Sequence, residues 1–181
     1  KRGGMNIPGH DRVICDVLII GGGGSGALAA LEASSEDGLR VIVVSRGPIS
    51  QSGLTPTGNG GTAFSSSFEH LFRNMVTAGN YLNDQNVIWS MFHETADAIE
   101  KLRRIGVTVT PLGPNGICVP GVETLSLAKR ELRKRPNVSL LEDVLIIRLV
   151  RQDGRITGAV ALDLASAKLL EINAKAVIIA T

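Results

Sequence analysis

The sequence predicts an α/β fold with a parallel sheet, because a buried strand, a glycine-rich turn, a helix and a second buried strand follow one another near its start. Residues 13–20 form a continuous apolar run, which is typical of a strand covered on both faces. Residues 21–26 form the glycine-rich turn, and residues 40–44 form the second apolar run. Such a βαβ unit has a right-handed crossover in nearly all known folds.

Helices are predicted wherever small or apolar residues recur at helical spacing. The small residues of 27–35 predict a helix that packs closely against the sheet. The other predicted helices share an apolar stripe and cover residues 68–78, 83–106 and 122–134. Residues 45–67 are rich in Gly, Ser, Thr, Pro and Asn, and are expected to form a long loop without regular structure. Residues 107–120 are expected to be a loop with one short strand.

The last third of the chain predicts further strands. They are expected at residues 138–141, 144–150, 156–162, 169–172 and 176–180. Asp153-Gly154 lies between two of these runs and is a strong signal for a β-hairpin. We therefore expect a β-meander beside the parallel sheet. Residues 1–12 are polar and are expected to be an N-terminal extension to a single domain of residues 13–181.

Composition narrows the classes of function. The net charge of +2 over 181 residues does not indicate a nucleic-acid partner. The two cysteines, Cys15 and Cys118, lack the neighbours of a metal or disulfide motif and are expected to be structural thiols. His10, His70 and His93 are scattered, so no metal site is expected. The sequence contains no signal-peptide pattern and no apolar stretch long enough to span a membrane, which predicts a cytoplasmic location.

The turn matches the dinucleotide-binding pattern Gly21-x-Gly23-x-x-Gly26. In this pattern the first glycine permits the tight exit from the strand. The second lets the backbone approach a pyrophosphate, and the third lets the helix and sheet pack closely. The phosphates then lie at the N-terminus of the helix, where the dipole favours negative charge. The turn therefore predicts a Rossmann-like domain that binds a dinucleotide.

The end of the second strand leaves the cofactor open. An acidic residue usually binds the adenosine ribose there, but this chain has Ser45 followed by Arg46. A basic residue at this place accommodates the 2′-phosphate of NADP in other Rossmann domains. From these residues alone, an NADP-binding domain is an alternative to an FAD-binding one.

Three short segments of the predicted long loop carry a resemblance to a known family. They are Ser45-Arg46-Gly47-Pro48, Ser52-Gly53-Leu54-Thr55 and Asn59-Gly60-Gly61. In this order and spacing they resemble the FAD-binding loop of the fumarate reductase, succinate dehydrogenase and L-aspartate oxidase flavoproteins. In that family the second strand commonly ends in Ser or Thr followed by a basic residue. The resemblance implies a glutathione-reductase-like FAD-binding domain with FAD as the cofactor.

The resemblance also implies which residues hold FAD. It places Gly21, Gly23, Gly24, Ser25 and Gly26 beside the pyrophosphate, and Ser45 and Arg46 beside the adenosine ribose. It places Ser52, Gly53 and Thr55 near the phosphates and the ribityl chain, and Asn59, Gly60 and Gly61 near the flavin ring. Val144 is expected beside the adenine, and Ala180 and Thr181 begin a further turn that touches the cofactor.

The implied activity is hydride transfer between flavin N5 and a dicarboxylate-like substrate. Members with covalently attached flavin carry a histidine where this chain has Leu54, so the FAD is expected to be non-covalent. The resemblance makes this chain the N-terminal part of such a flavoenzyme, with the substrate-binding capping domain expected after Thr181. It also implies an electron-transfer partner, which would bring the protein to the membrane periphery. The alternative is a non-catalytic nucleotide-binding module.

Overall fold

The computed structural model describes residues 11–35, 38–51, 53–63, 68–111 and 116–181. The chain divides into two compact units rather than the single domain that the sequence predicted. The first unit consists of Lys1–Leu54 and Ala128–Thr181, and the second consists of Thr55–Leu127.

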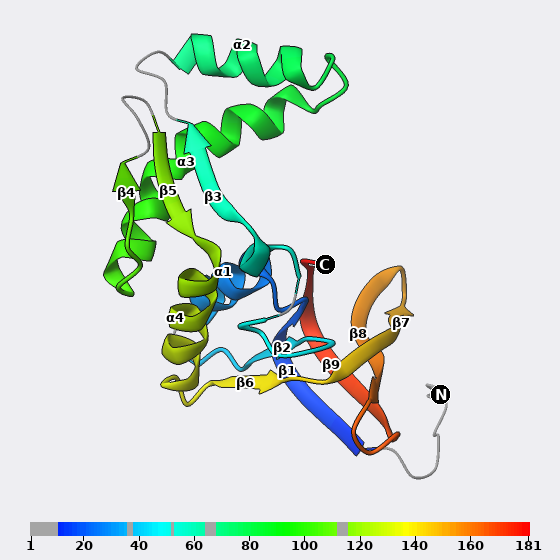
Figure 1. Ribbon diagram of the computed structural model, residues 1–181. Helices are drawn as coiled ribbons and strands as arrows, with labels where there is room; N and C mark the ends of the chain where they lie inside the picture. The colour runs from blue at the N-terminus through cyan, green and yellow to red at the C-terminus, as the bar shows by residue number, and fades with distance from the viewer. Residues whose placement is uncertain (1–10, 36–37, 52, 64–67, 112–115) are drawn as a thin grey trace. The chain divides into compact units, whose positions relative to one another are not determined.

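The first unit is built on a six-stranded sheet with the strand order β6-β2-β1-β9-β8-β7 (Figure 1). Four neighbouring strands run parallel: β6 (Val138–Leu141), β2 (Val41–Val44), β1 (Asp11–Ile20) and β9 (Leu169–Ile179). The strands β8 (Arg155–Asp163) and β7 (Val144–Gln152) continue the sheet as antiparallel neighbours. The predicted parallel sheet with a β-meander is therefore confirmed.

Strand β1 lies inside the sheet and is covered on both faces. Leu18 and Ile19 point to opposite faces, and both are fully buried. Leu18 belongs to an apolar cluster that includes residues of β7, β8 and β9. Ile19 belongs to a second cluster, which includes Ala30 of helix α1 (Gly24–Ala33) and Leu132 of helix α4 (Gly121–Arg133). This two-sided burial explains the continuous apolar run in the sequence.

The predicted hairpin joins β7 to β8. Asp153 and Gly154 both have positive φ angles, of 50° and 80°. A two-residue turn with both central residues in this conformation matches the right-handed twist of the flanking strands. Glycine reaches the conformation without a steric penalty, which is why this dipeptide predicted the hairpin correctly.

The second unit contains a small antiparallel sheet and helices. The sheet has the order β3-β5-β4, with β3 at Asn59–Ala63, β5 at Gly116–Pro120 and β4 at Thr110–Pro111. The helices are the short 3-10 helix η1 (Thr55–Thr57), α2 (Phe68–Ala78), α3 (Gln85–Arg104) and the beginning of α4. The side chain of Asp84 caps α3 by accepting a hydrogen bond of 2.9 Å from the Asn86 N–H.

Three expectations about these elements were wrong. The predicted loop of residues 45–67 contains η1 and β3, and residues 107–120 contain two strands instead of one. Strand β3 has the sequence Asn-Gly-Gly-Thr-Ala, which lacks an apolar alternation, so its pairing with β5 makes it a strand. The two strands expected at 169–172 and 176–180 are a single strand, β9, because β1 pairs with it through the polar residues between them.

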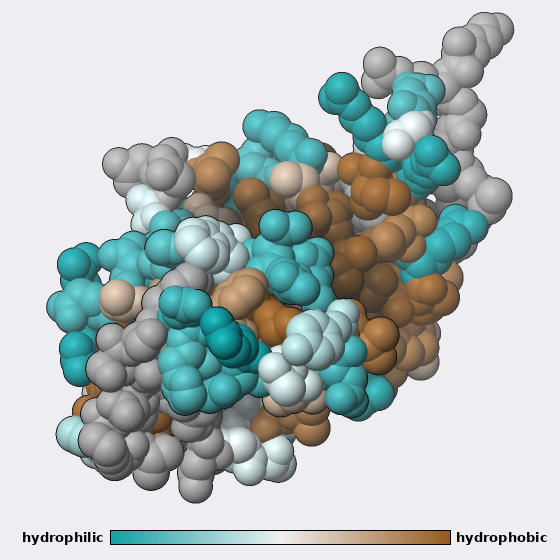
Figure 2. All heavy atoms as spheres, turned by 90° about the horizontal axis from the view of Figure 1, so that it is seen from above, coloured by the Kyte–Doolittle hydropathy of each residue, from teal (hydrophilic) through white to brown (hydrophobic). Residues whose placement is uncertain are grey.

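Within the described part of the chain, no helix combines the length and apolar character that a bilayer crossing requires. The same residues contain no group of His, Cys, Asp and Glu side chains that could hold a metal ion. Hydrophobic residues do reach the surface, and they gather in a broad area of the face that Figure 2 shows. Ile14, Ile147 and Ile179 are the most exposed of the large apolar residues on the strands of the first unit.

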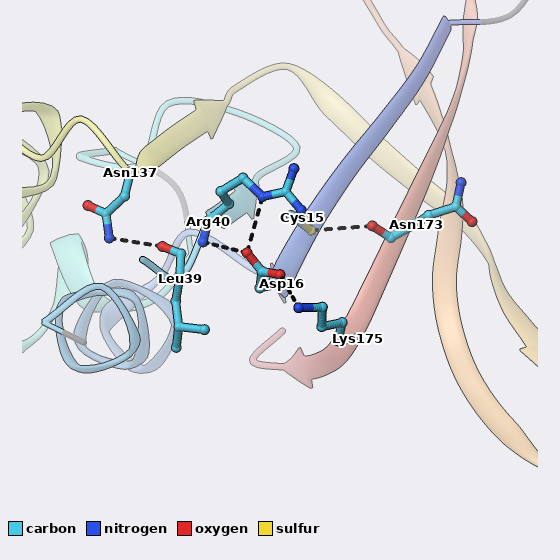
Figure 3. Close-up of polar contacts among 7 residues, drawn as sticks. All are labelled: Cys15, Asp16, Leu39, Arg40, Asn137, Asn173 and Lys175. Carbon is cyan, nitrogen blue, oxygen red and sulfur yellow. Dashed lines mark hydrogen bonds and ion pairs between the residues drawn. The ribbon is translucent and has the colours of Figure 1, made fainter. Parts of the chain in front are cut away.

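A buried carboxylate ties three strands of the sheet together (Figure 3). Asp16 of β1 accepts hydrogen bonds of 2.8 Å from the Arg40 backbone N–H and 3.1 Å from the Arg40 Nε–H. Its other oxygen lies 2.8 Å from Nζ of Lys175 on β9. The contact with Lys175, followed by those with Arg40, holds the pKa of Asp16 well below its usual range. The ionised side chain therefore connects β1 to β9 and to the residue before β2.

Replacing this carboxylate should change how the fold responds to acid. The folded pKa of Asp16 lies below its ordinary value of 3.8. Its contribution to stability is therefore complete above about pH 5 and is lost as the pH falls below that. We expect Asp16→Asn to lower the melting temperature at neutral pH and to make the loss of stability in acid shallower. Melting temperatures measured from about pH 7 to about pH 3 check this.

The matched control for this prediction is Asp97→Asn. Asp97 is exposed on α3 and lies 3.9 Å from Lys101, an arrangement that contributes little to stability. Its melting curve should follow the wild type at each pH. An Asp16→Asn variant with the same acid dependence as the wild type would contradict the role assigned to the Asp16 carboxylate.

The thiol of Cys15 lies beside this carboxylate and is structural, as the sequence predicted. Cys15 is buried in β1, and its Sγ–H donates to the backbone oxygen of Asn173 at 3.7 Å (Figure 3). Burial, followed by the charge of Asp16, raises its pKa to about 11. The thiol therefore stays protonated near neutral pH and is a poor nucleophile.

Candidate functional site

The glycine-rich turn leaves the sheet at the carboxyl ends of three neighbouring parallel strands. The N–H of Gly21 donates to the oxygen of Val44, at the end of β2, over 2.8 Å. The N–H of Ala180, just after β9, donates to the oxygen of Ile20 over 2.8 Å. Open α/β sheets bind their ligands outside the carboxyl ends of the strands, so this is where a cofactor is expected.

Two positions of the turn have room for glycine alone. Gly21 has a φ of 119°, and a Cβ atom there would overlap the carbonyl oxygen of Ala180. A Cβ atom at Gly26 would overlap the carbonyl oxygen of Gly21. In both cases the obstacle is backbone, which cannot turn aside as a flexible side chain can. The turn therefore brings the backbone and the start of helix α1 closer together than any other residue would allow.

The N-terminus of α1 suits a negatively charged ligand. Its N-cap is Gly23, whose backbone is extended, and the first intrahelical bond runs from Ala27 N–H to Gly23 O over 2.9 Å. The first turn contains Gly24 and the exposed Ser25, and it has no acidic residue. The positive end of the helix dipole is therefore not neutralised by a carboxylate of that turn. A pyrophosphate would find a complementary partial charge here.

The residues predicted beside the ribose and the adenine lie next to each other. The Ser45 N–H donates to Leu141 O over 2.9 Å, and the Ser45 oxygen accepts from the Val144 N–H over 3.0 Å. Ser45 and Val144 are buried, whereas Arg46 is exposed. These two bonds join the end of β2 to the corner between β6 and β7.

The fingerprint does not account for one further glycine. A Cβ atom at Gly22 would lie 2.5 Å from Oγ of Ser45 and 2.8 Å from Cγ1 of Ile49. Ile49 is fully buried, so its side chain and that of Ser45 pack directly against the turn. The sequence analysis did not assign a role to Ile49. The run of four consecutive glycines was a signal that something approaches the turn closely.

Glu142 is a second residue near the site that the sequence analysis did not single out. Its carboxylate accepts a 2.7 Å hydrogen bond from the Ile49 N–H and lies 2.6 Å from Nζ of Lys129. A guanidinium nitrogen of Arg133 lies 3.6 Å away. Partial burial is the largest influence on the pKa of Glu142 and acts to raise it. The contacts with Lys129, Ile49 and Arg133 together outweigh it and lower the pKa.

The remaining predicted residues fall into three groups. Gly53 has a φ of 81°, and a Cβ atom there would lie 3.7 Å from Cα of Gly23, so this residue lies against the turn. Leu54 is exposed, and Ala180 and Thr181 follow the end of β9. In the second unit, Thr55 begins η1, and the backbones of Asn59, Gly60 and Gly61 pair with β5. Ser52 lies outside the described residues.

Comparison with known proteins places this turn in a family. The family described as "FAD binding domain" matches residues 16–119 and 112–181, which together cover most of the chain. The chain belongs to this family. The match favours FAD over the NADP-binding alternative that Arg46 raised, and it confirms the predicted relationship to FAD-dependent oxidoreductases.

Several relatives share most of this chain. It is 31% identical to an FAD-dependent oxidoreductase of Methanocaldococcus jannaschii described as uncharacterized, covering 92% of this chain and 34% of that protein. It is 28% identical to one chain of the fumarate reductase (CoM/CoB) of Methanothermobacter marburgensis, covering 92% and 35%. The chain thus spans about a third of the length of these relatives.

Solved structures share the fold. An Escherichia coli quinol fumarate reductase superposes with a TM-score of 0.84 at 22% identity, covering 94% of this chain and 33% of that one. An adenylylsulfate reductase of Archaeoglobus fulgidus superposes with a TM-score of 0.76 at 23% identity, covering 95% and 31%. These likenesses confirm the predicted fold class of an FAD-binding domain.

Proposed function

We propose that this chain holds FAD, without a covalent bond, in a flavin-dependent oxidoreductase that acts on a dicarboxylate-like substrate. FAD supplies the hydride chemistry at N5, and the protein supplies position and electrostatics. The proposal is supported by the fumarate reductase and aspartate oxidase relatives, which include an L-aspartate oxidase of Halobacterium salinarum 27% identical to this chain. We also propose that the protein works in the cytoplasm or, through an electron-transfer partner, at the membrane periphery.

The observation that carries the proposal is the fit of the glycine-rich turn to a pyrophosphate. Added Cβ atoms at Gly21, Gly22 and Gly26 would overlap or crowd neighbouring atoms, and a helix with no acidic residue in its first turn begins at Gly24. Close backbone approach and the positive end of a helix dipole are the two features that pyrophosphate binding requires.

The roles of the individual residues are part of this proposal. Gly21, Gly23, Gly24, Ser25 and Gly26 would hold the pyrophosphate by their backbones. Ser45 and Arg46 would lie beside the adenosine ribose, with the Val144 backbone beside the adenine. Ser52, Gly53 and Thr55 would contact the phosphates and ribityl chain. Asn59, Gly60 and Gly61 would lie near the flavin ring, and Ala180 and Thr181 would complete the cradle. No catalytic side chain is assigned within this segment.

Release of the flavin tests the cofactor and its attachment together. The purified protein is expected to be yellow and, after acid precipitation, to leave all its flavin in the supernatant as FAD. The reason is Leu54, whose aliphatic side chain cannot form a bond to the flavin. Absorbance and chromatography of the supernatant and the pellet measure this. Flavin retained in the pellet would contradict non-covalent binding, and a colourless protein that FAD cannot reconstitute would contradict the proposed function itself.

The substrate class is tested with the full-length protein. We expect turnover of fumarate, succinate or aspartate with an artificial electron carrier, followed by the change in carrier absorbance. If the protein binds FAD but turns over none of these, the dicarboxylate part of the proposal is wrong and the non-catalytic alternative gains support.

A further inference from the structure

The segment that follows β2 is anchored at three points to the corner between β6 and β7. Two anchors are the backbone hydrogen bonds of Ser45 with Leu141 and Val144. The third is the hydrogen bond from the Ile49 N–H to the Glu142 carboxylate, which joins residues 93 positions apart in the sequence. This third anchor depends on a side chain, so the identity of residue 142 controls it.

The third anchor leads directly to the glycine-rich turn. The Ile49 side chain is fully buried, and its Cγ1 atom lies 2.8 Å from where a Cβ atom of Gly22 would stand. Moving Ile49 would therefore open a space beside Gly22 or push the turn out of place. Close packing in protein interiors transmits such shifts because it leaves few voids to absorb them.

Glu142 is kept in the form that anchors best. Lys129 and Arg133, both on α4, lie on its two carboxylate oxygens at 2.6 and 3.6 Å. They help to lower the pKa of the carboxyl group despite its partial burial, so it is ionised near neutral pH. An ionised carboxylate accepts a stronger hydrogen bond from a backbone N–H than a neutral group does.

We propose that Glu142 is a positioning residue for cofactor binding, which holds Ile49, and through it Gly22, in the arrangement that the pyrophosphate requires. This inference rests on the proposed function. Glu142 itself touches no cofactor in this scheme. It acts through the Ile49 N–H, and Lys129 and Arg133 offset the cost of burying its charge.

The experiment compares Glu142→Gln with Glu142→Met in the full chain. The two replacements are similar in length and volume, but the glutamine oxygen can still accept from the Ile49 N–H and the methionine thioether is a weak acceptor. We expect FAD affinity to fall about tenfold in Glu142→Met and less than about threefold in Glu142→Gln. Titration of FAD into the apoprotein gives the affinities.

Amide hydrogen exchange of the apoprotein provides a readout that needs no flavin. The Ile49 amide is expected to exchange slowly in the wild type and in Glu142→Gln, and much faster in Glu142→Met. The matched control is Glu131→Met. Glu131 lies on α4 and its carboxylate is 2.7 Å from Lys134, and its side chain is 23% exposed against 22% for Glu142. This control should leave both the Ile49 amide and FAD affinity unchanged.

The outcomes separate this inference from the proposed function. If the wild type does not bind FAD, the proposed function fails and the inference fails with it. If the wild type binds FAD and Glu142→Met binds it equally well, the proposed function stands and the inference is overturned. Should Glu142→Met not fold, the wild-type apoprotein decides: an Ile49 amide as protected as that of Ser45 supports the inference, and one that exchanges like an open loop overturns it.

Discussion

Gly26→Ala is expected to weaken FAD binding by about 100-fold, an effect of about 2.7 kcal/mol. The added Cβ atom would overlap the carbonyl oxygen of Gly21, so the turn and the start of α1 would have to separate. That movement displaces the backbone groups proposed to hold the pyrophosphate. Alanine is the better helix former by about 1 kcal/mol, so a glycine at this helical position is explained by packing. Quenching of FAD fluorescence on titration into the apoprotein measures the affinity.

The same substitution should also lower stability by about 3 kcal/mol, because overpacking against backbone cannot be relieved by a side-chain rotation. The control is Gly38→Ala. Gly38 has a φ of 84° but nothing within 4 Å of an added Cβ atom, so it carries backbone strain without a collision. We expect Gly38→Ala to cost about 1 kcal/mol of stability and to leave FAD affinity unchanged. A Gly26→Ala variant that binds FAD within twofold of the wild type would refute the packing argument.

Leu18→Ala should destabilise the chain by about 3 kcal/mol. Leu18 lies in the middle of β1 and is fully buried in a cluster with residues of β2, β7, β8 and β9. Truncation removes apolar contact and leaves a cavity that the surrounding strands cannot close without losing their pairing. Urea unfolding followed by far-UV circular dichroism gives the change in the free energy of unfolding.

Leu82→Ala provides the comparison for this core substitution. Leu82 is 90% exposed, so its truncation should change the free energy of unfolding by less than about 0.5 kcal/mol. Equal urea midpoints for the two variants would show that the Leu18 cluster does not stabilise the fold as described.

The glycine-rich turn was predictable because each requirement is local. A buried strand, three spaced glycines and a helix of small residues are adjacent in the sequence, so the pattern could be recognised without knowing the rest of the fold. The hairpin at Asp153-Gly154 was predictable for the same reason, since the conformation of two residues determines the turn.

Strand β3 shows where this kind of reasoning fails. Its residues have neither an apolar alternation nor strong β propensity, and its partner β5 begins more than fifty residues later. Strand β9 shows the opposite error: Asn173 and Lys175 interrupt its apolar pattern, but Lys175 pairs with the buried Asp16 of β1. In both cases pairing between distant segments decides the structure.

The sequence by itself determined the βαβ unit, the glycine-rich turn and the FAD cofactor, because these depend on short contiguous motifs. Only the tertiary structure revealed that Ser45 and Ile49 pack against Gly22, and that Glu142 holds Ile49 in place with Lys129 and Arg133 beside it. These contacts join segments that are far apart in the chain. Neither residue spacing nor composition records which of them the folded backbone brings together.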